Sequence, residues 1–475
     1  MTYEAEAKLF VDGAWQGVEG REARPVMNPA TGAVLGEVPL ATPADLDRAL
    51  AASARGFVRW RDTDPGERAR VLRAAAALMR NRADAIATTL TREQGKPIGE
   101  ARGEVEASAQ LLDFYAGEAT RIEGRVLMRP TGARSIVIRQ PVGPVASFTP
   151  WNFPVYLMIK KLAPALAAGC SVIAKPPEET PGCTTAAMAC LIDAGVPADV
   201  AQLVFGDPDM VSRHLLGSPV IRAISFTGSV PVGRHLMKLA ADGLKRVTME
   251  LGGHAPVLVF DDCDLERTLD LVVPQKFRNA GQVCVSPTRF YVQAGIYDRF
   301  VAGFADRTRA IRIGDGLDPA TAMGPLAHQR RPAAVGALVE DAVLRGAVLA
   351  AGGQRSGDGY FYQPTVLAGV PADAEVMRQE PFGPVALIRP FADEAEAIAE
   401  ANRLPYGLAS FLFTENGRRA NRVADAIEAG MVGVNGFAIS NADSPFGGVK
   451  DSGFGSEGGR EGLDPFLFVK AIHQA

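Results

Sequence analysis

Cys284 has a sequence setting in which its thiol could act as a nucleophile. It ends the turn-like run Gly281-Gln282-Val283-Cys284, shortly after the basic residues Lys276 and Arg278. Because nearby positive charge favours the thiolate, the reactive form of cysteine, we expect this setting to activate the sulfur. From the local sequence alone, however, a small buried filler is the more frequent role for a single cysteine.

Two further segments carry polar side chains that could act in catalysis if Cys284 is the nucleophile. Glu250 ends the strand-like run 246–249 and precedes Leu251-Gly252-Gly253, where the chain can turn sharply and expose a carboxylate. A lone glutamate at a strand end is more often a solvated surface group. Asn152 lies in Pro150-Trp151-Asn152-Phe153-Pro154, where its amide could stabilise an oxyanion or could equally cap a helix.

The elements that must position these residues follow an α/β rhythm. Apolar runs at 145–148, 171–174, 201–205 and 221–226 alternate with helix-like stretches at 155–168, 183–193 and 210–216. This alternation predicts right-handed βαβ units and a mostly parallel sheet, whose ligands bind beyond the carboxyl ends of the strands. A second α/β region runs from about 255 to 436, with strands expected near 257–260, 290–292, 385–387 and 410–413.

Other segments are expected to lie around this frame. Residues 43–117 show helical periodicity and should cover a sheet face, while residues 9–15 form a hairpin at Asp12-Gly13, which we expect to be peripheral. The alternating run within 132–140 predicts a strand outside the main sheet. The Gly-rich stretch 447–462 is interpreted as a loop.

One strand-to-helix junction has the character of a nucleotide site. Phe226-Thr227-Gly228-Ser229, with Gly233, follows a strand and opens a helix, so free backbone N–H groups could hold a pyrophosphate. The glycine spacing is not GxGxxG, and an ordinary capped turn remains an alternative. Lys175 and Glu178 follow another strand end, where ribose hydroxyls could bind; a surface lysine is the plainer interpretation.

Composition excludes several classes of protein. A chain of 475 residues is longer than one hydrophobic core usually supports, so two or more domains are expected. Its composition, 47% hydrophobic and 22% charged, is that of an ordinary globular protein, and no apolar run is long enough for a bilayer span. A net charge of -4 gives no basic field, so we expect small-molecule partners, no nucleic acid and no membrane. Five irregularly spaced cysteines without a CxxC pair, and no export signal, predict no metal site and a reducing, cytoplasmic location.

Seven segments together resemble the aldehyde dehydrogenase superfamily, in the same order across nearly the whole chain. They are Pro150-Trp151-Asn152-Phe153-Pro154, Lys175-Pro176-Pro177-Glu178, Phe226-Thr227-Gly228-Ser229, Glu250-Leu251-Gly252-Gly253, Gly281-Gln282-Val283-Cys284, Glu380-Pro381-Phe382-Gly383-Pro384 and Pro445-Phe446-Gly447-Gly448. The resemblance implies an α/β fold with a Rossmann-like dinucleotide-binding domain, an α/β catalytic domain and a small β oligomerisation unit.

The resemblance also implies a catalytic mechanism. Cys284 would be the nucleophile, and Asn152 with the backbone N–H of Cys284 would form the oxyanion hole. Hydride would leave the resulting thiohemiacetal for the nicotinamide, producing a thioester that water cleaves with Glu250 as general base. Lys161 and Glu457 match positions associated with a proton relay around that base.

The same family assigns cofactor contacts. Lys175 and Glu178 match residues that hold the adenosine ribose, Ser229 a pyrophosphate contact and Trp151 an adenosine-side wall, while Glu380 and Phe382 match the nicotinamide-ribose clamp. The remaining expected cofactor residues are Phe226, Gly228, Gly233 and Leu251. A carboxylate at Glu178 would repel a 2′-phosphate, so we predict that NAD is preferred over NADP.

Within the superfamily, Lys276-Phe277-Arg278-Asn279 and Ile439-Ser440-Asn441 resemble succinate-semialdehyde dehydrogenases. Arg278 and Ser440 would then grip the distal carboxylate of the substrate. Lys160 stands where some of those enzymes have a second substrate arginine. Ser286 stands where some have a regulatory cysteine, so no disulfide switch is expected. Succinate semialdehyde is the first candidate substrate, with 2-oxoglutarate semialdehyde as the alternative.

The resemblance finally predicts a domain division and an assembly. Residues 1–119 and 140–252 would form the cofactor-binding domain, 253–450 the catalytic domain, and 120–139 with 451–475 the oligomerisation unit and tail of a homodimer or homotetramer. Three other functions stay open: a CoA-acylating dehydrogenase, a thioester hydrolase using Cys284 and Glu250, and a non-catalytic binding protein on the same scaffold.

Overall fold

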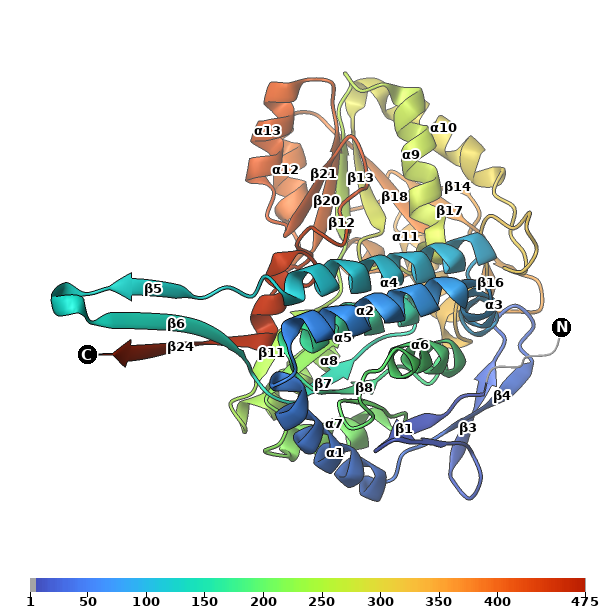
Figure 1. Cartoon of the computed structure of the whole chain (residues 1–475). Helices are drawn as coiled ribbons and strands as arrows, with labels where there is room; N and C mark the ends of the chain where they lie inside the picture. Colours follow the sequence, from blue (N-terminus) through green and yellow to red (C-terminus); the bar gives the residue numbers. More distant parts are fainter. Residues whose placement is uncertain (1–5, 475) are drawn as a thin grey trace.

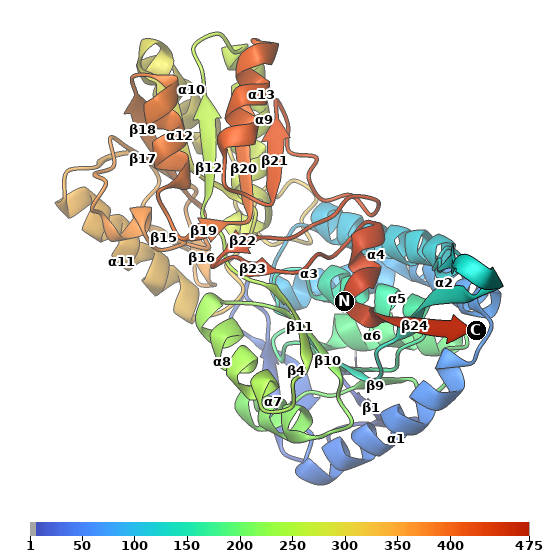
Figure 2. The ribbon, with the colours of Figure 1, turned by 90° about the vertical axis from the view of Figure 1, so that its left-hand side faces the viewer.

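Two separate β-sheets, each with its own helices, organise the computed structural model, which describes residues 6–474 (Figures 1 and 2). One buried apolar core spans residues 7–251 and takes in Leu463, Phe466 and Leu467 near the C-terminus, while a second core spans residues 255–446. The α/β fold class predicted from the sequence is confirmed. Among the described helices, none has the length and apolar character needed to cross a membrane.

The first sheet has eight strands in the order β2-β1-β9-β8-β7-β10-β11-β23. Their bounds are β1 (Leu9–Val11), β2 (Ala14–Gln16), β7 (Val145–Phe148), β8 (Val172–Lys175), β9 (Ala201–Leu203), β10 (Ala223–Thr227), β11 (Arg246–Glu250) and β23 (Gly453–Phe454). From β9 to β11 all pairings are parallel. Strands β7, β8, β9 and β10 are buried throughout, which explains why they read as unbroken apolar runs.

Helices enclose this sheet where the periodicity predicted them. They are α1 (Pro43–Arg61), α2 (Pro65–Asn81), α3 (Ala83–Gln94), α4 (Ile98–Ala119), α5 (Pro154–Ala168), α6 (Pro181–Asp193), α7 (Pro208–Gly217) and α8 (Val230–Ala241). Helix α4 packs against both α2 and α5 (Figure 1). The chain leaves β7 toward β8 on one side and later enters β10 on the other, so a topological switch point lies between β7 and β10.

The second sheet has seven strands in the order β14-β17-β18-β13-β12-β20-β21, parallel except for β14. Their bounds are β12 (Ala255–Val259), β13 (Pro287–Gln293), β14 (Val348–Ala351), β17 (Thr365–Ala368), β18 (Val385–Phe391), β20 (Ala409–Phe413) and β21 (Met431–Val434). The helices of this part are α9 (Leu265–Phe277), α10 (Tyr297–Arg309), α11 (Arg330–Leu344), α12 (Glu394–Asn402) and α13 (Gly417–Ala426). The four strands predicted here are confirmed.

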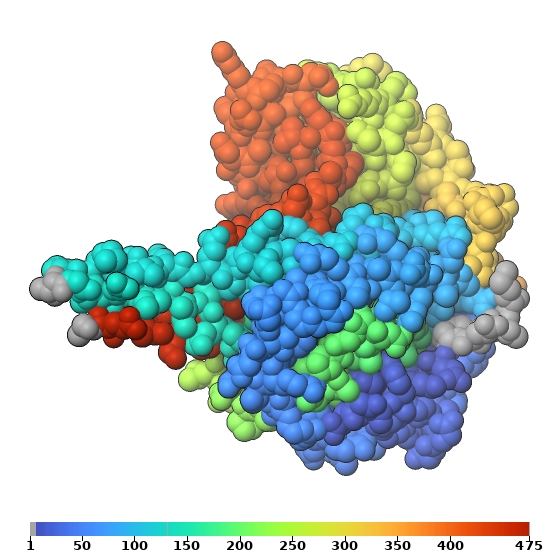
Figure 3. All heavy atoms as spheres, viewed as in Figure 1, coloured from blue at the N-terminus to red at the C-terminus, as the bar shows by residue number. Residues whose placement is uncertain are grey.

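A three-stranded antiparallel sheet projects from the body as an arm (Figures 1 and 3). It consists of β5 (Arg125–Met128), β6 (Arg134–Pro141) and β24 (Leu467–Gln474), in the order β24-β6-β5. The prediction that the strand near 132–140 lies outside the main sheet is therefore confirmed. The arm exposes the apolar side chains of Val126, Leu127, Met128 and Val469.

Short elements complete the fold. Three two-stranded sheets pair β3 (Ala23–Met27) with β4 (Val34–Pro39), β15 (Arg355–Ser356) with β16 (Phe361–Tyr362), and β19 (Tyr406–Gly407) with β22 (Val449–Lys450). The 3-10 helices are η1 (Pro130–Gly132), η2 (Arg278–Gly281), η3 (Ala294–Ile296), η4 (Glu375–Met377) and η5 (Arg460–Phe466).

Two sequence predictions about local structure are confirmed but incomplete: the hairpin predicted at 9–15 is β1-β2, and most of 447–462 is loop. The hairpin β1-β2 is not merely peripheral, because Phe10 of β1 pairs with Leu203 of β9 and extends the eight-stranded sheet. The stretch 447–462 is not only a loop, because β23 pairs with β11 beside Glu250. In both cases long-range pairing with a sheet edge decides the conformation, and local composition does not report such pairing.

Candidate active site

Two adjoining cavities lie at the carboxyl ends of β7, β10 and β11, at the switch point of the first sheet. The inner cavity, about 300 Å³, is lined by residues that include Asn152, Leu251, Cys284, Glu380 and Phe382. The outer cavity, about 590 Å³, has walls that include Lys175, Glu178 and Phe226. The two share a rim formed by Pro150, Trp151, Thr227, Gly228 and Ser229. A two-part ligand could therefore lie across both spaces.

Cys284 reaches the inner cavity from a tight turn at the end of α9. Three successive residues, Asn279, Ala280 and Gly281, have positive φ angles of 49°, 53° and 70°. A Cβ atom at position 281 would stand 2.1 Å from the carbonyl oxygen of Gly383, so only glycine fits there. The turn ends the run from α9 and presents Cys284, which stays partly exposed.

The surroundings of Cys284 favour the neutral thiol over the thiolate, contrary to the sequence prediction. Burial raises the pKa of Cys284 to about 12, the charge of Glu380 adds to this, and the charge of Lys160 opposes it. Lys276 does not activate the sulfur, because its ammonium donates to Ser286 Oγ at 3.2 Å and burial lowers its pKa to about 7. Arg278 turns outward over the Phe153 ring, 5.3 Å from its centroid.

Asn152 is fixed against the cysteine turn. It lies between β7 and α5, and its Nδ2 donates to the Gln282 carbonyl at 3.0 Å, while Oδ1 has no hydrogen-bond partner in residues 6–474. An amide nitrogen has two N–H groups, so one remains available beside Cys284. The structure thus brings Asn152 and Cys284, 132 residues apart by their numbers 152 and 284, to one cavity.

Glu250 ends β11 in a buried position, although the sequence indicated an exposed carboxylate. Its side chain is only 2% exposed, and neither carboxylate oxygen has a hydrogen-bond partner among the described residues. Burial and the neighbouring charge of Glu457 raise the pKa of Glu250 well above its usual value, and Lys160 and Lys161 oppose that rise. A carboxyl with a raised pKa is a stronger base than an exposed one, so Glu250 is suited to accept a proton.

Lys161 and Glu457 form a buried ion pair behind this carboxylate. Ser225 Oγ bridges them, since it lies 3.2 Å from Lys161 Nζ and 3.2 Å from Glu457 Oε1. Within the part of the chain that the structure describes, Glu457 Oε2 has no hydrogen-bond partner. The three groups connect α5, β10 and the segment after β23 in one polar chain next to Glu250.

The outer cavity gathers polar groups suited to a dinucleotide. Lys175 and Glu178 form an ion pair with an N–O distance of 2.7 Å, and Glu178 also accepts the Gly206 N–H at 2.9 Å. Ser229 caps α8 without using its hydroxyl in a capping hydrogen bond, which leaves a helix N-terminus open to an anion.

Glu380 and Phe382, the residues expected to clamp the nicotinamide ribose, line the inner cavity, whereas Gly233 of α8 does not. Burial raises the pKa of Glu380 to about 8, and the Phe382 ring lies 5.5 Å from that of Trp151. Gly233 lines neither of the two cavities; a Cβ there would stand 2.5 Å from Leu251 Cδ2. The missing side chain at Gly233 therefore lets α8 pack closely against Leu251.

The three residues expected to bind substrate all pack beside aromatic rings. Lys160 is buried, and its Nζ lies 3.5 Å from the centroid of the Phe446 ring. Ser440 Oγ lies 3.4 Å from the hydroxyl of Tyr156, one helical turn before Lys160. Arg278 instead borders a separate cavity of about 820 Å³ whose lining does not include Cys284.

Comparison with known proteins decides what this site is. A family model described as the aldehyde dehydrogenase family matches residues 15–472. The chain belongs to the aldehyde dehydrogenase family. It is 48% identical to 4-(hydroxymethyl)benzenesulfonate dehydrogenase TsaD1 of Comamonas testosteroni, over 98% of each chain. It is 42% identical to the NADP(+) succinate-semialdehyde dehydrogenase GabD of Escherichia coli (strain K12), over 98% of this chain and 96% of that protein.

A solved structure supports the same assignment. The crystal structure of succinate-semialdehyde dehydrogenase from Burkholderia pseudomallei matches with a TM-score of 0.97 at 40% identity, covering 99% of this chain and 98% of that one. The family resemblance and fold predicted from the sequence are confirmed. This aldehyde dehydrogenase is an NAD(P)-dependent oxidoreductase that acts on a small-molecule aldehyde.

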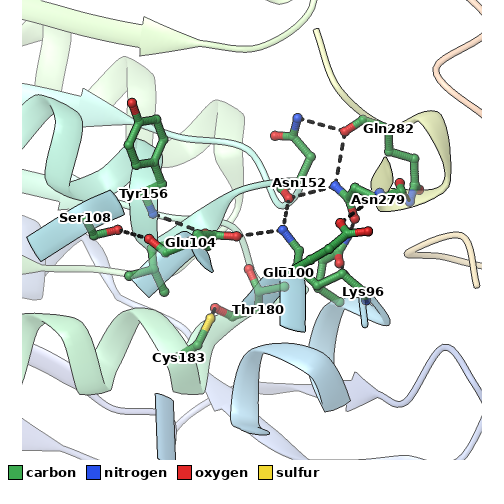
Figure 4. A network of polar contacts seen from close by, with 12 residues as sticks. Lys96, Glu100, Glu104, Ser108, Asn152, Tyr156, Thr180, Cys183, Asn279 and Gln282 are labelled. Carbon is green, nitrogen blue, oxygen red and sulfur yellow. Dashed lines mark hydrogen bonds and ion pairs between the residues drawn. The ribbon is translucent and has the colours of Figure 1, made fainter. Parts of the chain in front are cut away.

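Sequence reasoning missed a set of buried polar residues behind the aldehyde dehydrogenase site. Lys96, Glu104, Asn279 and Gln282 connect α3 and α4 with Asn152 and the cysteine turn (Figure 4). One signal was present in the sequence: Glu104 lies at helical spacing among Ala101, Val105 and Ser108, on the face of α4 that is buried. A carboxylate on such a face needs a partner in the fold.

Proposed function

We propose that this enzyme oxidises an aldehyde carrying a distal anionic group, with succinate semialdehyde as the first candidate, to the carboxylic acid through a thioester on Cys284. The observation that carries the proposal is Lys160. It is a buried cation without a hydrogen bond or ion pair to the described residues, it packs on Phe446, and its charge acts on Cys284. Ser440 and Arg278 would add a hydroxyl and a guanidinium farther out.

The proposed chemistry assigns each group a step. The Cys284 thiol gives its proton to the Glu250 carboxylate as the sulfur attacks the carbonyl carbon, and the new oxyanion accepts from Asn152 Nδ2 and the Cys284 backbone N–H. Glu250 passes this proton to solvent before it acts on water. A nicotinamide bound in the inner cavity would supply the hydride acceptor, and loss of hydride from this carbon would leave a thioester on the sulfur. Glu250 removes a proton from the attacking water, and the Lys161–Glu457 pair passes that proton onward. Hydrolysis returns the thiol and releases the acid.

The described residues fit a dinucleotide across the two cavities. The open N-terminus of α8 at Ser229 suits a pyrophosphate, and the Lys175–Glu178 pair suits ribose hydroxyls. Because Glu178 would repel a 2′-phosphate, we propose a preference for NAD, although one relative is named for NADP. The ratio of kcat/KM with NAD to that with NADP tests this proposal, and a clear NADP preference would contradict it.

Two other acidic substrates are candidates. 2-Oxoglutarate semialdehyde offers the same distal carboxylate. An aldehyde with a sulfonate is favoured by the relative named for 4-(hydroxymethyl)benzenesulfonate, and by Lys160 itself. An ammonium is a point charge that suits a three-oxygen anion, whereas arginine matches a planar carboxylate in two-point contact.

A spectrophotometric assay tests the proposed substrate class. NADH formation is followed at equal concentrations of succinate semialdehyde, a sulfonated aldehyde and a neutral aldehyde of similar length, using the parent enzyme and Arg278→Ala. We expect the parent to prefer the anionic aldehydes, and Arg278→Ala to lose about tenfold of that preference in kcat/KM. An unchanged preference in Arg278→Ala would remove this residue from the anion grip.

The same assay addresses the competing functions. A buried general base next to the thioester favours hydrolysis over transfer to CoA, so adding CoA should leave the product a free acid. A CoA-dependent product would identify an acylating enzyme. Acid formation without NADH would identify a hydrolase. If neither NADH nor acid forms, a non-catalytic binding protein would be the remaining function.

We further propose that residues 1–119 and 140–252 form the cofactor-binding unit, 253–450 the catalytic unit, and 120–139 with 451–475 the oligomerisation unit and tail; residues 1–5 and 475 lie outside the described residues. The support is the division into two apolar cores and an arm with four exposed apolar side chains. Exposed apolar side chains on a protruding sheet favour burial against another copy. A homodimer or homotetramer should result.

A further inference from the structure

A fully buried ion pair lies behind the proposed oxyanion hole. Lys96 follows α3, Glu104 lies in α4, and Lys96 Nζ is 2.6 Å from Glu104 Oε2 with both side chains inaccessible to solvent (Figure 4). Neither residue lines the inner or the outer cavity. The pair therefore cannot contact substrate or cofactor from these positions, and any influence on catalysis must pass through a neighbour.

Each member of the pair holds the segment that carries Asn152. Lys96 Nζ donates to the backbone carbonyl of Asn152 at 2.7 Å and lies 3.9 Å from the centroid of the Phe153 ring. Glu104 Oε1 accepts the backbone N–H groups of Val155 and Tyr156 at 3.0 and 3.1 Å. These are unpaired donors of the first turn of α5, so a carboxylate there also complements the helix dipole.

Asn279 joins the same carbonyl to the cysteine turn. Its Nδ2 donates to the Asn152 carbonyl at 3.0 Å, and its Oδ1 accepts from Gln94 Nε2 at 2.8 Å. Asn152 in turn donates to the carbonyl of Gln282, two residues before the nucleophile. The backbone carbonyl of Asn152 thus accepts hydrogen bonds from Lys96 and Asn279, while the side-chain amide of Asn152 contacts the turn that presents Cys284.

Stability alone does not account for burying these charges. Replacing a buried ion pair by apolar groups of similar size is often neutral or stabilising, because the desolvation of two charges offsets their attraction. A pair of this kind is better explained where it fixes a geometry. Here the geometry is the orientation of the Asn152 side-chain amide relative to the sulfur of Cys284.

We propose that Lys96 and Glu104 are positioning residues, which act through the main chain of residues 152–156 to hold the Asn152 amide where the oxyanion forms. This inference rests on the proposed role of Asn152. A displacement of about 1 Å at such a donor can reduce a rate by about a hundredfold, and removing an oxyanion donor altogether costs about 10²–10³ in kcat.

The test variant is Lys96→Met combined with Glu104→Gln. This double variant removes both charges of the Lys96–Glu104 pair together, and the glutamine oxygen can still accept from the α5 N–H groups, so the loss centres on the bond to the Asn152 carbonyl. We expect kcat to fall about 10- to 100-fold, with KM for aldehyde and NAD changed less than about threefold.

A second readout separates positioning from general damage. Alkylation of Cys284 by iodoacetamide displaces iodide at a saturated carbon and forms no oxyanion, so its rate should stay within about twofold of the parent if only Asn152 is misplaced. Lys245→Met is the matched control. Lys245 is also buried and donates to two backbone carbonyls, of Ser218 and Ile221, but lines neither cavity. This control should retain parental kcat.

Asn152→Ala, alone and combined with the double variant, completes a mutant cycle that tests whether the pair acts through Asn152. If Lys96 and Glu104 act through Asn152, adding their double substitution to Asn152→Ala should lower kcat by less than about threefold beyond Asn152→Ala alone. Parental kcat in the double variant, or losses that multiply with Asn152→Ala, would overturn the inference. Parental kcat in Asn152→Ala itself would instead refute the proposed role of Asn152, so the two failures are distinguishable.

Discussion

Substituting Lys160 by methionine should make Cys284 less reactive, even toward a reagent that carries no charge. Lys160 is the residue whose charge opposes the burial that raises the pKa of Cys284 to about 12. Removing this cation raises the pKa of the thiol further, so a smaller fraction is thiolate at any assay pH. Because that pKa lies far above the assay range, the thiolate fraction falls in direct proportion to the acid dissociation constant.

The size of the effect follows from the burial of the cation. Two unit charges roughly 8 Å apart interact by about 2 kcal/mol at an effective dielectric constant of about 20. Water in the cavity screens part of this, and a net effect of about 1.4 kcal/mol corresponds to a tenfold change in thiolate fraction. We therefore expect Lys160→Met to be alkylated about tenfold more slowly than the parent at pH 8.

Iodoacetamide alkylation at a series of pH values is the assay, with peptide mapping to locate the label on Cys284. Lys160→Arg is the matched control, since it keeps the charge and should stay within about threefold of the parent. The reagent is neutral, so a lysine that merely attracted an anionic substrate would leave its rate unchanged. Equal rates for the parent and Lys160→Met would refute the electrostatic role and restrict Lys160 to substrate binding.

Three shorter predictions follow from other parts of the structure. Glu457→Gln removes a charge that raises the pKa of Glu250, so the proposed base ionises at lower pH and the ascending limb of the kcat profile should move to lower pH; a limb that stays in place would contradict this coupling. Glu178→Gln should raise kcat/KM with NADP about tenfold relative to NAD, and an unaltered ratio in the same kinetic assay would mean that other residues set the preference. Combining Met128→Asp with Val469→Asp places charge on the exposed arm and should lower the molar mass measured by light scattering at micromolar concentration; the parental mass would exclude this face from the assembly.

Much of the first sheet was predictable because its strands are covered on both faces. Fully buried parallel strands appear as short apolar runs between helices, and this contrast predicted β7, β8, β9 and β10 to within a few residues. The switch point follows from the same order of elements, so the sequence also located the edge at which Asn152 and Ser229 meet. The order of the seven motifs then identified the family.

Charge placement was less accessible to sequence reasoning. Lys276 and Arg278 precede Cys284 in the chain and were expected to activate it, yet one is turned toward Ser286 and the other lies over Phe153. Lys160 acts on the sulfur instead, because α5 packs behind the inner cavity. Distance through space determines a Coulomb interaction, and distance along the chain does not report it.

The sequence by itself determined which residues could do the chemistry: a cysteine after a turn, an amide between prolines, a carboxylate at a strand end and a helix opening at Ser229. These depend on local geometry and residue type, which neighbouring residues largely set. Only the tertiary structure decided their ionisation and aim. The buried state of Glu250, the charge of Lys160 beside Cys284 and the Lys96–Glu104 pair behind Asn152 all arise where segments distant in the chain exclude water together, and burial is a property of that packing alone.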